Sequence, residues 1–157
     1  MKKLLLIVIF LFGFINADVT VLEKYKKACD MADAKACFKL GFMYYEGVEL
    51  NNDYSKAKEY FKKACDLGYS EGCFYVGLMY ESGQGVKQSY PKAKEFYTKA
   101  CDGGDGKGCF YLGLAYYYCQ GGGRDYSKAK KLFEKACKGG IKGACAMYKE
   151  LQYSEEI

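Results

Sequence analysis

The segment at residues 62–73, KKACDLGYSEGC, places two cysteines eight residues apart, on either side of an Asp-Leu-Gly turn. The same arrangement recurs with a period of 36 residues. One series is Cys29, Cys65, Cys101 and Cys137, and the other is Cys37, Cys73, Cys109 and Cys145. A fixed period of this length is typical of repeat architectures, and four copies exceed the minimum of about three that a stacked array needs.

Each copy has the pattern of two helices joined by a short turn. In residues 53–88, apolar side chains recur at helical spacing after Asp53 and again from about Ser70 to Glu81. Good N-cap residues precede the first helix of three copies: Asp53, Ser89 and Asp125. Glycines suited to a left-handed helix end follow these helices: Gly68, Gly104 and Gly140. Glycines inside the second helices predict the close approach of a facing helix: Gly41, Gly77 and Gly113.

These patterns predict an all-α fold, a right-handed α-solenoid of four disulfide-stapled helix-pair repeats. The predicted organisation is a signal peptide at residues 1–17 and one repeat domain at residues 18–157. The repeats are assigned to residues 18–52, 53–88, 89–124 and 125–157, the last including a terminal cap.

The N-terminal segment, MKKLLLIVIFLFGFINA, indicates export. Two lysines precede an apolar run from Leu4 to Ile15, and Ala17 lies at a plausible cleavage point. The run is too short to span a bilayer comfortably, which favours a secretory signal peptide. Because the cleavage pattern is imperfect, retention as an anchor is the alternative. We therefore expect a secreted or periplasmic protein.

The charge balance does not favour a nucleic-acid partner. Without Lys2 and Lys3, the expected mature chain keeps 22 of the 24 lysines and arginines against 19 acidic residues, a net charge of +3. It contains one arginine, Arg124, and no concentrated basic block. We expect neither nucleic acid nor, after signal removal, a membrane as partner.

Export and spacing together favour disulfides over metal or redox chemistry. Paired cysteines persist as disulfides outside the cytosol, and the chain contains no histidine and no Cys-x-x-Cys. We therefore expect no metal and no cofactor. The predicted bridges are Cys29–Cys37, Cys65–Cys73, Cys101–Cys109 and Cys137–Cys145. The ninth cysteine, Cys119, stands where other copies have Gly47 and Gly83, and it is either free or paired with a second molecule.

The second helices carry the motif Cys-x₂-[LV]-G-x₂-Tyr, which is similar to the tetratricopeptide signature. The period, the G-x-G-V loop and the stretch DYSKAKEYFKKA resemble the Sel-one-like branch of that superfamily. The paired cysteines narrow the resemblance to the secreted Helicobacter cysteine-rich proteins, whose repeats each carry one helix-bridging disulfide. This resemblance implies penicillin binding and weak β-lactamase activity, and hence a hydrolase linked to antibiotic resistance.

The residues themselves give this chemistry little support. Ser-x-x-Lys occurs at Ser55–Lys58 and Ser127–Lys130, but the partner motifs Ser-Asp-Asn and Lys-Thr-Gly are missing. The equivalent position of the third copy is Pro91, which suits a first helical turn and cannot be a nucleophile. We therefore interpret the serines as residues of the helix start, and no catalytic residue is assigned.

A ligand face follows from the resemblance to tetratricopeptide repeats. Carried onto this chain, the groove positions are Lys35, Phe38, Phe42, Tyr45, Glu71, Phe74, Leu78, Glu81, Lys107, Phe110, Leu114, Tyr117 and Tyr118. Aromatic rings interleaved with charges suit a peptide or peptidoglycan-like ligand. The alternative is that most of these rings form the core between repeats. We expect Tyr45, Tyr117 and Tyr118 to be the most exposed.

Three functional hypotheses follow. The first is an exported protein that binds peptides or cell-wall fragments on its concave face, with penicillin binding and weak β-lactam hydrolysis implied by the resemblance. The second is a non-enzymatic interaction module with a bacterial or host protein as partner. The third is a protein that acts through Cys119, either as a reactive thiol or by forming a covalent dimer.

Overall fold

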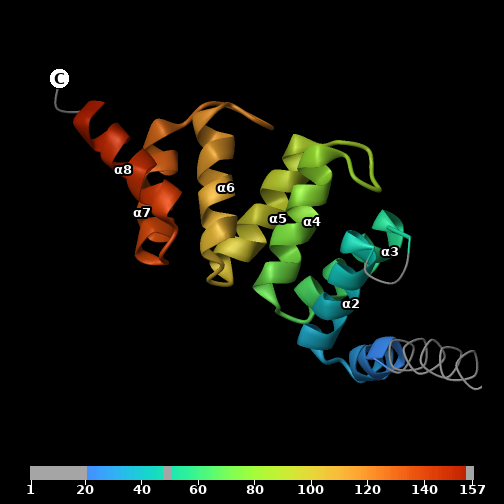
Figure 1. The fold of residues 1–157 in the computed structure, drawn as a ribbon. Helices are drawn as coiled ribbons and strands as arrows, with labels where there is room; N and C mark the ends of the chain where they lie inside the picture. Colours follow the sequence, from blue (N-terminus) through green and yellow to red (C-terminus); the bar gives the residue numbers. More distant parts are fainter. Residues whose placement is uncertain (1–20, 48–50, 155–157) are drawn as a thin grey trace, which may run out of the picture.

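The computed structural model describes residues 21–47 and 51–154, and the regular elements in these ranges are all helices (Figure 1). The predicted signal peptide lies outside them. A helical segment at residues 21–30 comes first. The helices that follow are α2 (Ala34–Glu46), α3 (Tyr54–Asp66), α4 (Ser70–Ser82), α5 (Tyr90–Asp102), α6 (Gly106–Tyr117), α7 (Tyr126–Lys138) and α8 (Lys142–Ser154). The predicted all-α solenoid of helix pairs is confirmed.

The helices follow one another in a continuous row, and each helix from α2 onward packs against its neighbours in the chain (Figure 1). The second helices of successive pairs also touch, since α4 contacts α6 directly. We call the surface formed by α2, α4 and α6 the second-helix face. The surface formed by α3, α5 and α7 is the first-helix face.

The helix boundaries arise from the residues that the sequence marked. The Asp53 carboxylate accepts a hydrogen bond from the backbone N–H of Lys56 at 3.0 Å, which caps α3. At the other end, Gly68 has φ +89° and lies just beyond the helix. The backbone N–H of Tyr69 donates to the carbonyl of Ala64, which satisfies an end carbonyl of α3 as a left-handed cap does. The predicted helix ends are therefore confirmed.

The core repeats with the same period. Three aromatic side chains from the first helices are buried 36 residues apart: Phe61, Tyr97 and Phe133. Each ring lies on the glycine of a second helix, as Tyr97 does on Gly77. A Cβ atom added at Gly77 would lie 2.6 Å from Cδ1 of Tyr97 and 3.2 Å from the carbonyl oxygen of Ala93. The glycines therefore permit the close helix contact that the sequence predicted.

Gly77→Ala is expected to destabilise the fold by about 1–2 kcal/mol. Because the added Cβ would lie well inside the normal contact distance of the Tyr97 ring, overpacking costs about 2–3 kcal/mol, the upper part of the usual range. The better helix propensity of alanine returns about 1 kcal/mol. The control is Gly143→Ala in α8, where the added Cβ would meet Phe110 at an ordinary 3.4 Å. Chemical denaturation measures both variants. Equal stability of Gly77→Ala and the wild type would contradict this packing.

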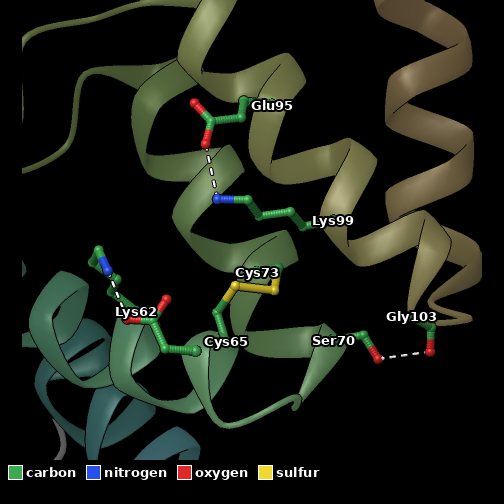
Figure 2. Close-up of a disulfide and its surroundings, with 8 residues drawn as sticks. Lys62, Cys65, Ser70, Cys73, Glu95, Lys99 and Gly103 are labelled. Carbon is green, nitrogen blue, oxygen red and sulfur yellow. Dashed lines mark hydrogen bonds and ion pairs between the residues drawn. A yellow bond between two sulfur atoms is a disulfide. The ribbon is translucent and has the colours of Figure 1, made fainter.

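Each disulfide joins the end of a first helix to the start of its second helix. The four predicted pairs are all present: Cys29–Cys37, Cys65–Cys73, Cys101–Cys109 and Cys137–Cys145. Figure 2 shows Cys65–Cys73 beside the hydrogen bond from the Ser70 hydroxyl to the carbonyl of Gly103, at 3.1 Å. That bond ties one helix pair to the next. Cys119 is an exposed free thiol.

Candidate functional site

A pocket of about 480 Å³ lies on the second-helix face, at the N-terminal end of the described array. Its walls come from the helical segment 21–30, α2 and α4. They are formed by Tyr25, Phe38, Lys39, Phe42, Met43, Glu71 and Tyr75. Four aromatic rings and one methionine make the lining mainly apolar, and one cation and one anion add charge. Such a combination is typical of ligand sites on proteins.

Tyr75 of α4 contacts two other aromatic residues of the pocket, Phe38 and Phe42. Its ring stacks on Phe61 with the centroids 4.8 Å apart, and it meets Phe38 and Phe42 edge-on at 5.5 and 5.9 Å. Burial, followed by the charge of Glu71, raises the pKa of Tyr75 above its ordinary value. The phenol therefore stays neutral at physiological pH. The contacts between the rings form the apolar wall of the pocket.

The two charged side chains of the pocket differ in their partners. Glu71 forms an ion pair with Lys107 of α6 at 3.6 Å and accepts a hydrogen bond from the Tyr69 hydroxyl at 3.4 Å. Lys39 donates to the hydroxyl of Tyr25 at 3.1 Å, and its Nζ lies 4.9 Å from the centroid of that ring. Within the described residues no carboxylate pairs with Lys39. The positive charge of the pocket is therefore left without an internal counter-ion there.

The structure brings together only part of the residues predicted to form a ligand face. Phe38, Phe42 and Glu71 line the pocket, and Lys107 joins them through its ion pair. Phe42 is 37% exposed. Phe74, in contrast, is only 5% exposed because the rings of Tyr75, Tyr97 and Tyr111 surround it. The alternative that predicted ligand residues belong to the core therefore describes Phe74.

The remaining predicted residues lie outside the pocket, on α2, α4 and α6. The half-buried Glu81 accepts a hydrogen bond from the hydroxyl of Tyr97, whose ring lies in the core. Burial and this carboxylate raise the pKa of Tyr97 well above its usual range. Phe110 packs against Phe133 at 5.8 Å. The others remain at the surface, Lys35 exposed and Leu78 and Leu114 half-buried.

The three tyrosines expected to be most exposed behave differently. Tyr118 is 59% exposed. Tyr45 is half-buried, and its hydroxyl donates to Gln84 Oε1 at 2.9 Å. Tyr117 is also half-buried, and its hydroxyl donates to Glu150 of α8 at 3.4 Å. The expectation holds for Tyr118, whereas the other two hydroxyls bind side chains of adjacent segments.

Four pocket residues were missing from the predicted ligand face: Tyr25, Lys39, Met43 and Tyr75. The repeat pattern contained a signal for one of them, Lys39. The positions equivalent to Lys39 in the next two copies are Tyr75 and Tyr111, so a lysine replaces an aromatic residue at this point of the first copy.

A second hollow of about 420 Å³ lies at the disulfide shown in Figure 2, between the turns of two successive helix pairs. Charged and polar groups around it bind one another: Lys99 pairs with Glu95 at 2.8 Å, and Lys62 pairs with Asp66 at 2.6 Å. The backbone and the Cys65–Cys73 bridge form much of the rest of its lining. We interpret this hollow as a feature of the packing between two successive repeats.

The two Ser-x-x-Lys motifs lie at the starts of first helices. Ser55 and Ser127 lie exposed in the first turns of α3 and α7, next to the capping residues Asp53 and Asp125. Among the residues that the structure describes, no group of three or more potential metal ligands is close enough to hold an ion. No helix in those ranges combines the length and apolar character needed to cross a bilayer.

Many solved structures resemble the chain, and three of them illustrate the likeness. One is a protective antigen of uropathogenic Escherichia coli strains that displays an SLR fold, with a TM-score of 0.75 and 32% sequence identity, and the match covers 78% of this chain. The second is a Sel1 repeat protein from Oxalobacter formigenes, with a TM-score of 0.75, 26% identity and 82% of this chain covered. The third is Helicobacter pylori cysteine rich protein B, with a TM-score of 0.65, 34% identity and 82% of this chain covered. The matches cover 26%, 97% and 92% of those chains, so this chain spans about a quarter of the antigen. No significant match appears among curated proteins.

The family comparison agrees with the fold. The Sel1 repeat model matches residues 34–69, 70–105 and 106–141. Each match is 36 residues long, which is the predicted period. The matches begin at the start of a second helix, whereas the predicted repeats begin at a first helix. The three matches cover more than half of the sequence, and the solved structures include Sel1 repeat proteins. The chain therefore belongs to the Sel1 repeat family.

Proposed function

We propose that this chain is a non-catalytic module that binds an extended segment of a partner protein on its second-helix face. Sel1 repeat proteins mediate protein–protein interaction. The observation that carries the proposal is the pocket between α2 and α4, because it combines exposed aromatic surface with an uncompensated positive charge. Aromatic anchors surrounded by polar groups are the usual centre of protein interfaces.

The second-helix face also has the extent that a peptide needs. Beyond the pocket it continues with Leu78, Lys107 and Leu114, all half-buried or exposed. Helices that pack side by side lie about 8–10 Å apart, and an extended peptide of about 12 residues spans about 40 Å. One such segment can therefore cross α2, α4 and α6.

The proposal includes export to an oxidising compartment, either the periplasm or the exterior. Its support is the set of four disulfides, which would not persist in a reducing cytosol. Penicillin binding and β-lactam hydrolysis remain implications of the family resemblance alone, and no described residue is assigned to them. Cell-wall fragments as ligands and a dimer through Cys119 remain predictions from the sequence.

The experiment is a selection of random peptides of about 12 residues displayed on phage, with the disulfide-bonded chain as bait. Affinities of selected peptides are then measured for Leu114→Glu on α6 and for Thr98→Glu, its charge-matched control on α5, where Thr98 is exposed. We expect Leu114→Glu to weaken binding by about tenfold or more, a change of about 1.4 kcal/mol, and Thr98→Glu to leave it unchanged. Equal losses in both variants, or no selected peptide at all, would contradict the proposal.

A further inference from the structure

The pocket exists because one ring of a repeating stack is replaced. In two inner copies, a tyrosine of the second helix lies against an aromatic ring 14 residues earlier. Tyr75 stacks on Phe61 at 4.8 Å, and Tyr111 contacts Tyr97 at 5.4 Å. In the first copy the same spacing pairs Lys39 with Tyr25, and a lysine side chain takes the place of the ring.

The replacement opens the aromatic surface beside it. In the second copy, the ring of Tyr75 packs edge-on against the adjacent Phe74 at 5.4 Å, and Phe74 is almost fully buried. In the first copy the neighbour of Phe38 in the chain is Lys39, whose ammonium group turns to Tyr25. Phe38 is half-buried and Phe42 is exposed. The walls of a ring site are therefore present without the ring that fills the equivalent place in the next copy.

The charge of the site is set by Lys39. The carboxylate of Glu71 is engaged by Lys107 and by the hydroxyl of Tyr69. Lys39 donates a hydrogen bond to the hydroxyl of Tyr25 and lies over its ring, and no carboxylate of the described residues pairs with it. A half-buried ammonium group beside apolar rings attracts a carboxylate more strongly than a fully hydrated one does, because water screens it less.

We propose that the pocket receives an aromatic side chain of the partner segment and that an acidic side chain next to it in that segment pairs with Lys39. The incoming ring contacts Phe38 and Phe42 in the pocket, beside the Lys39 ammonium group that lies over Tyr25. This inference rests on the proposed function and names the partner chemistry of the same site.

An acidic side chain fits the site better than the carboxylate of a chain end. Proteins that capture a terminal carboxylate surround it with free backbone N–H groups. Here the walls are side chains of helices, and Lys39 and Tyr75 lie inside α2 and α4, where backbone N–H groups are used in the helix ladder. The donor available to the ligand is the flexible ammonium group of Lys39.

The probe is a blocked hexapeptide that contains one glutamate next to one tryptophan. The protein contains no tryptophan, so tryptophan emission reports the peptide alone. We expect saturable binding of this peptide, about fivefold to tenfold weaker binding when the glutamate is replaced by glutamine, and loss of binding when the tryptophan is replaced by alanine. Equal affinity of the glutamate and glutamine peptides would overturn the acidic part of the inference.

Three variants of the chain complete the test. Lys39→Tyr restores the ring of the inner copies, fills the pocket and is expected to abolish binding. Lys39→Met removes the charge and is expected to erase the preference for glutamate over glutamine. Lys131→Met on α7 is the control for the loss of one exposed lysine and is expected to change nothing. Circular dichroism and thermal unfolding verify that each variant is folded.

The outcomes separate this inference from the proposed function. If phage-selected peptides bind and respond to Leu114→Glu but bind folded Lys39→Tyr unchanged, the pocket inference fails and the module stands. If no peptide binds, both fail. Tighter binding of an unblocked peptide that ends in tryptophan would assign the pocket to a chain end instead. Self-association that Lys39→Tyr abolishes would assign it to a second copy of the chain. Either of these results overturns the inference.

Discussion

Reduction of the four disulfides is expected to unfold the chain at about 37 °C. In the chain-entropy model, a loop closed by cysteines eight residues apart contributes about 2.5 kcal/mol of stability. The four loops do not overlap, so their contributions add to about 10 kcal/mol. The total stability of a protein domain is about 5–15 kcal/mol, so the bridges provide a large share of it.

The measurement is far-ultraviolet circular dichroism before and after reduction, with thiols counted in denaturant. The oxidised chain has one free cysteine, Cys119, and the fully reduced chain has nine. A Cys119→Ser variant is the control because it removes the thiol that could exchange with the bridges. An unchanged melting curve with all of the disulfides reduced would show that packing alone holds the array.

Tyr97→Ala is expected to destabilise the fold by about 3–5 kcal/mol, the usual cost of truncating a buried large aromatic residue. Tyr97 is 2% exposed. Its ring lies on Gly77 of α4 and contacts Tyr111 of α6 at 5.4 Å. It therefore contacts two successive second helices. Its loss leaves a cavity that Gly77, which has no side chain, cannot fill.

The matched variant is Tyr97→Phe, because phenylalanine occupies the equivalent positions in two other copies, Phe61 and Phe133. It keeps the ring and removes only the hydrogen bond to Glu81, so we expect a loss of about 1 kcal/mol. Urea denaturation gives both values. A loss below about 1 kcal/mol for Tyr97→Ala would mean that the centre of the array relaxes around the cavity, contrary to close packing.

The fold could be predicted because its determinants are local and repeated. The cap at Asp53, the glycine at position 68 and the bridge between Cys65 and Cys73 all act within a few residues of one another. The period then copies each of them along the chain. The glycine at position 77 was also informative, since a costly residue inside a helix requires a close neighbour.

The candidate site could be predicted only in part, because exposure depends on contacts between copies. Phe38 and Phe74 occupy equivalent positions, yet only Phe38 lines the pocket. The difference comes from the residue beside each ring, a lysine at 39 and a tyrosine at 75. The periodic pattern treats the copies as equal, whereas the pocket depends on the point where one copy departs from the others.

Glu81 shows the same limit in the opposite direction. Its position on the expected ligand face suggested a charge for fixing a ligand, but its carboxylate accepts a hydrogen bond from a buried tyrosine of the next helix. The sequence contained one sign of this contact. The equivalent core positions, 61 and 133, are phenylalanines, so the buried tyrosine at position 97 carries an additional hydroxyl that needs a hydrogen-bond partner.

The central claim is that the second-helix face binds a partner segment. Its most direct test is nuclear magnetic resonance of the ¹⁵N-labelled, disulfide-bonded chain during titration with a phage-selected peptide. Our account predicts that the shifts gather on α2, α4 and α6, including the amides around Phe42 and Leu114, while α3, α5 and α7 stay unchanged on their exposed sides. Shifts gathered on the lysine-rich surfaces of α3, α5 and α7 would contradict it.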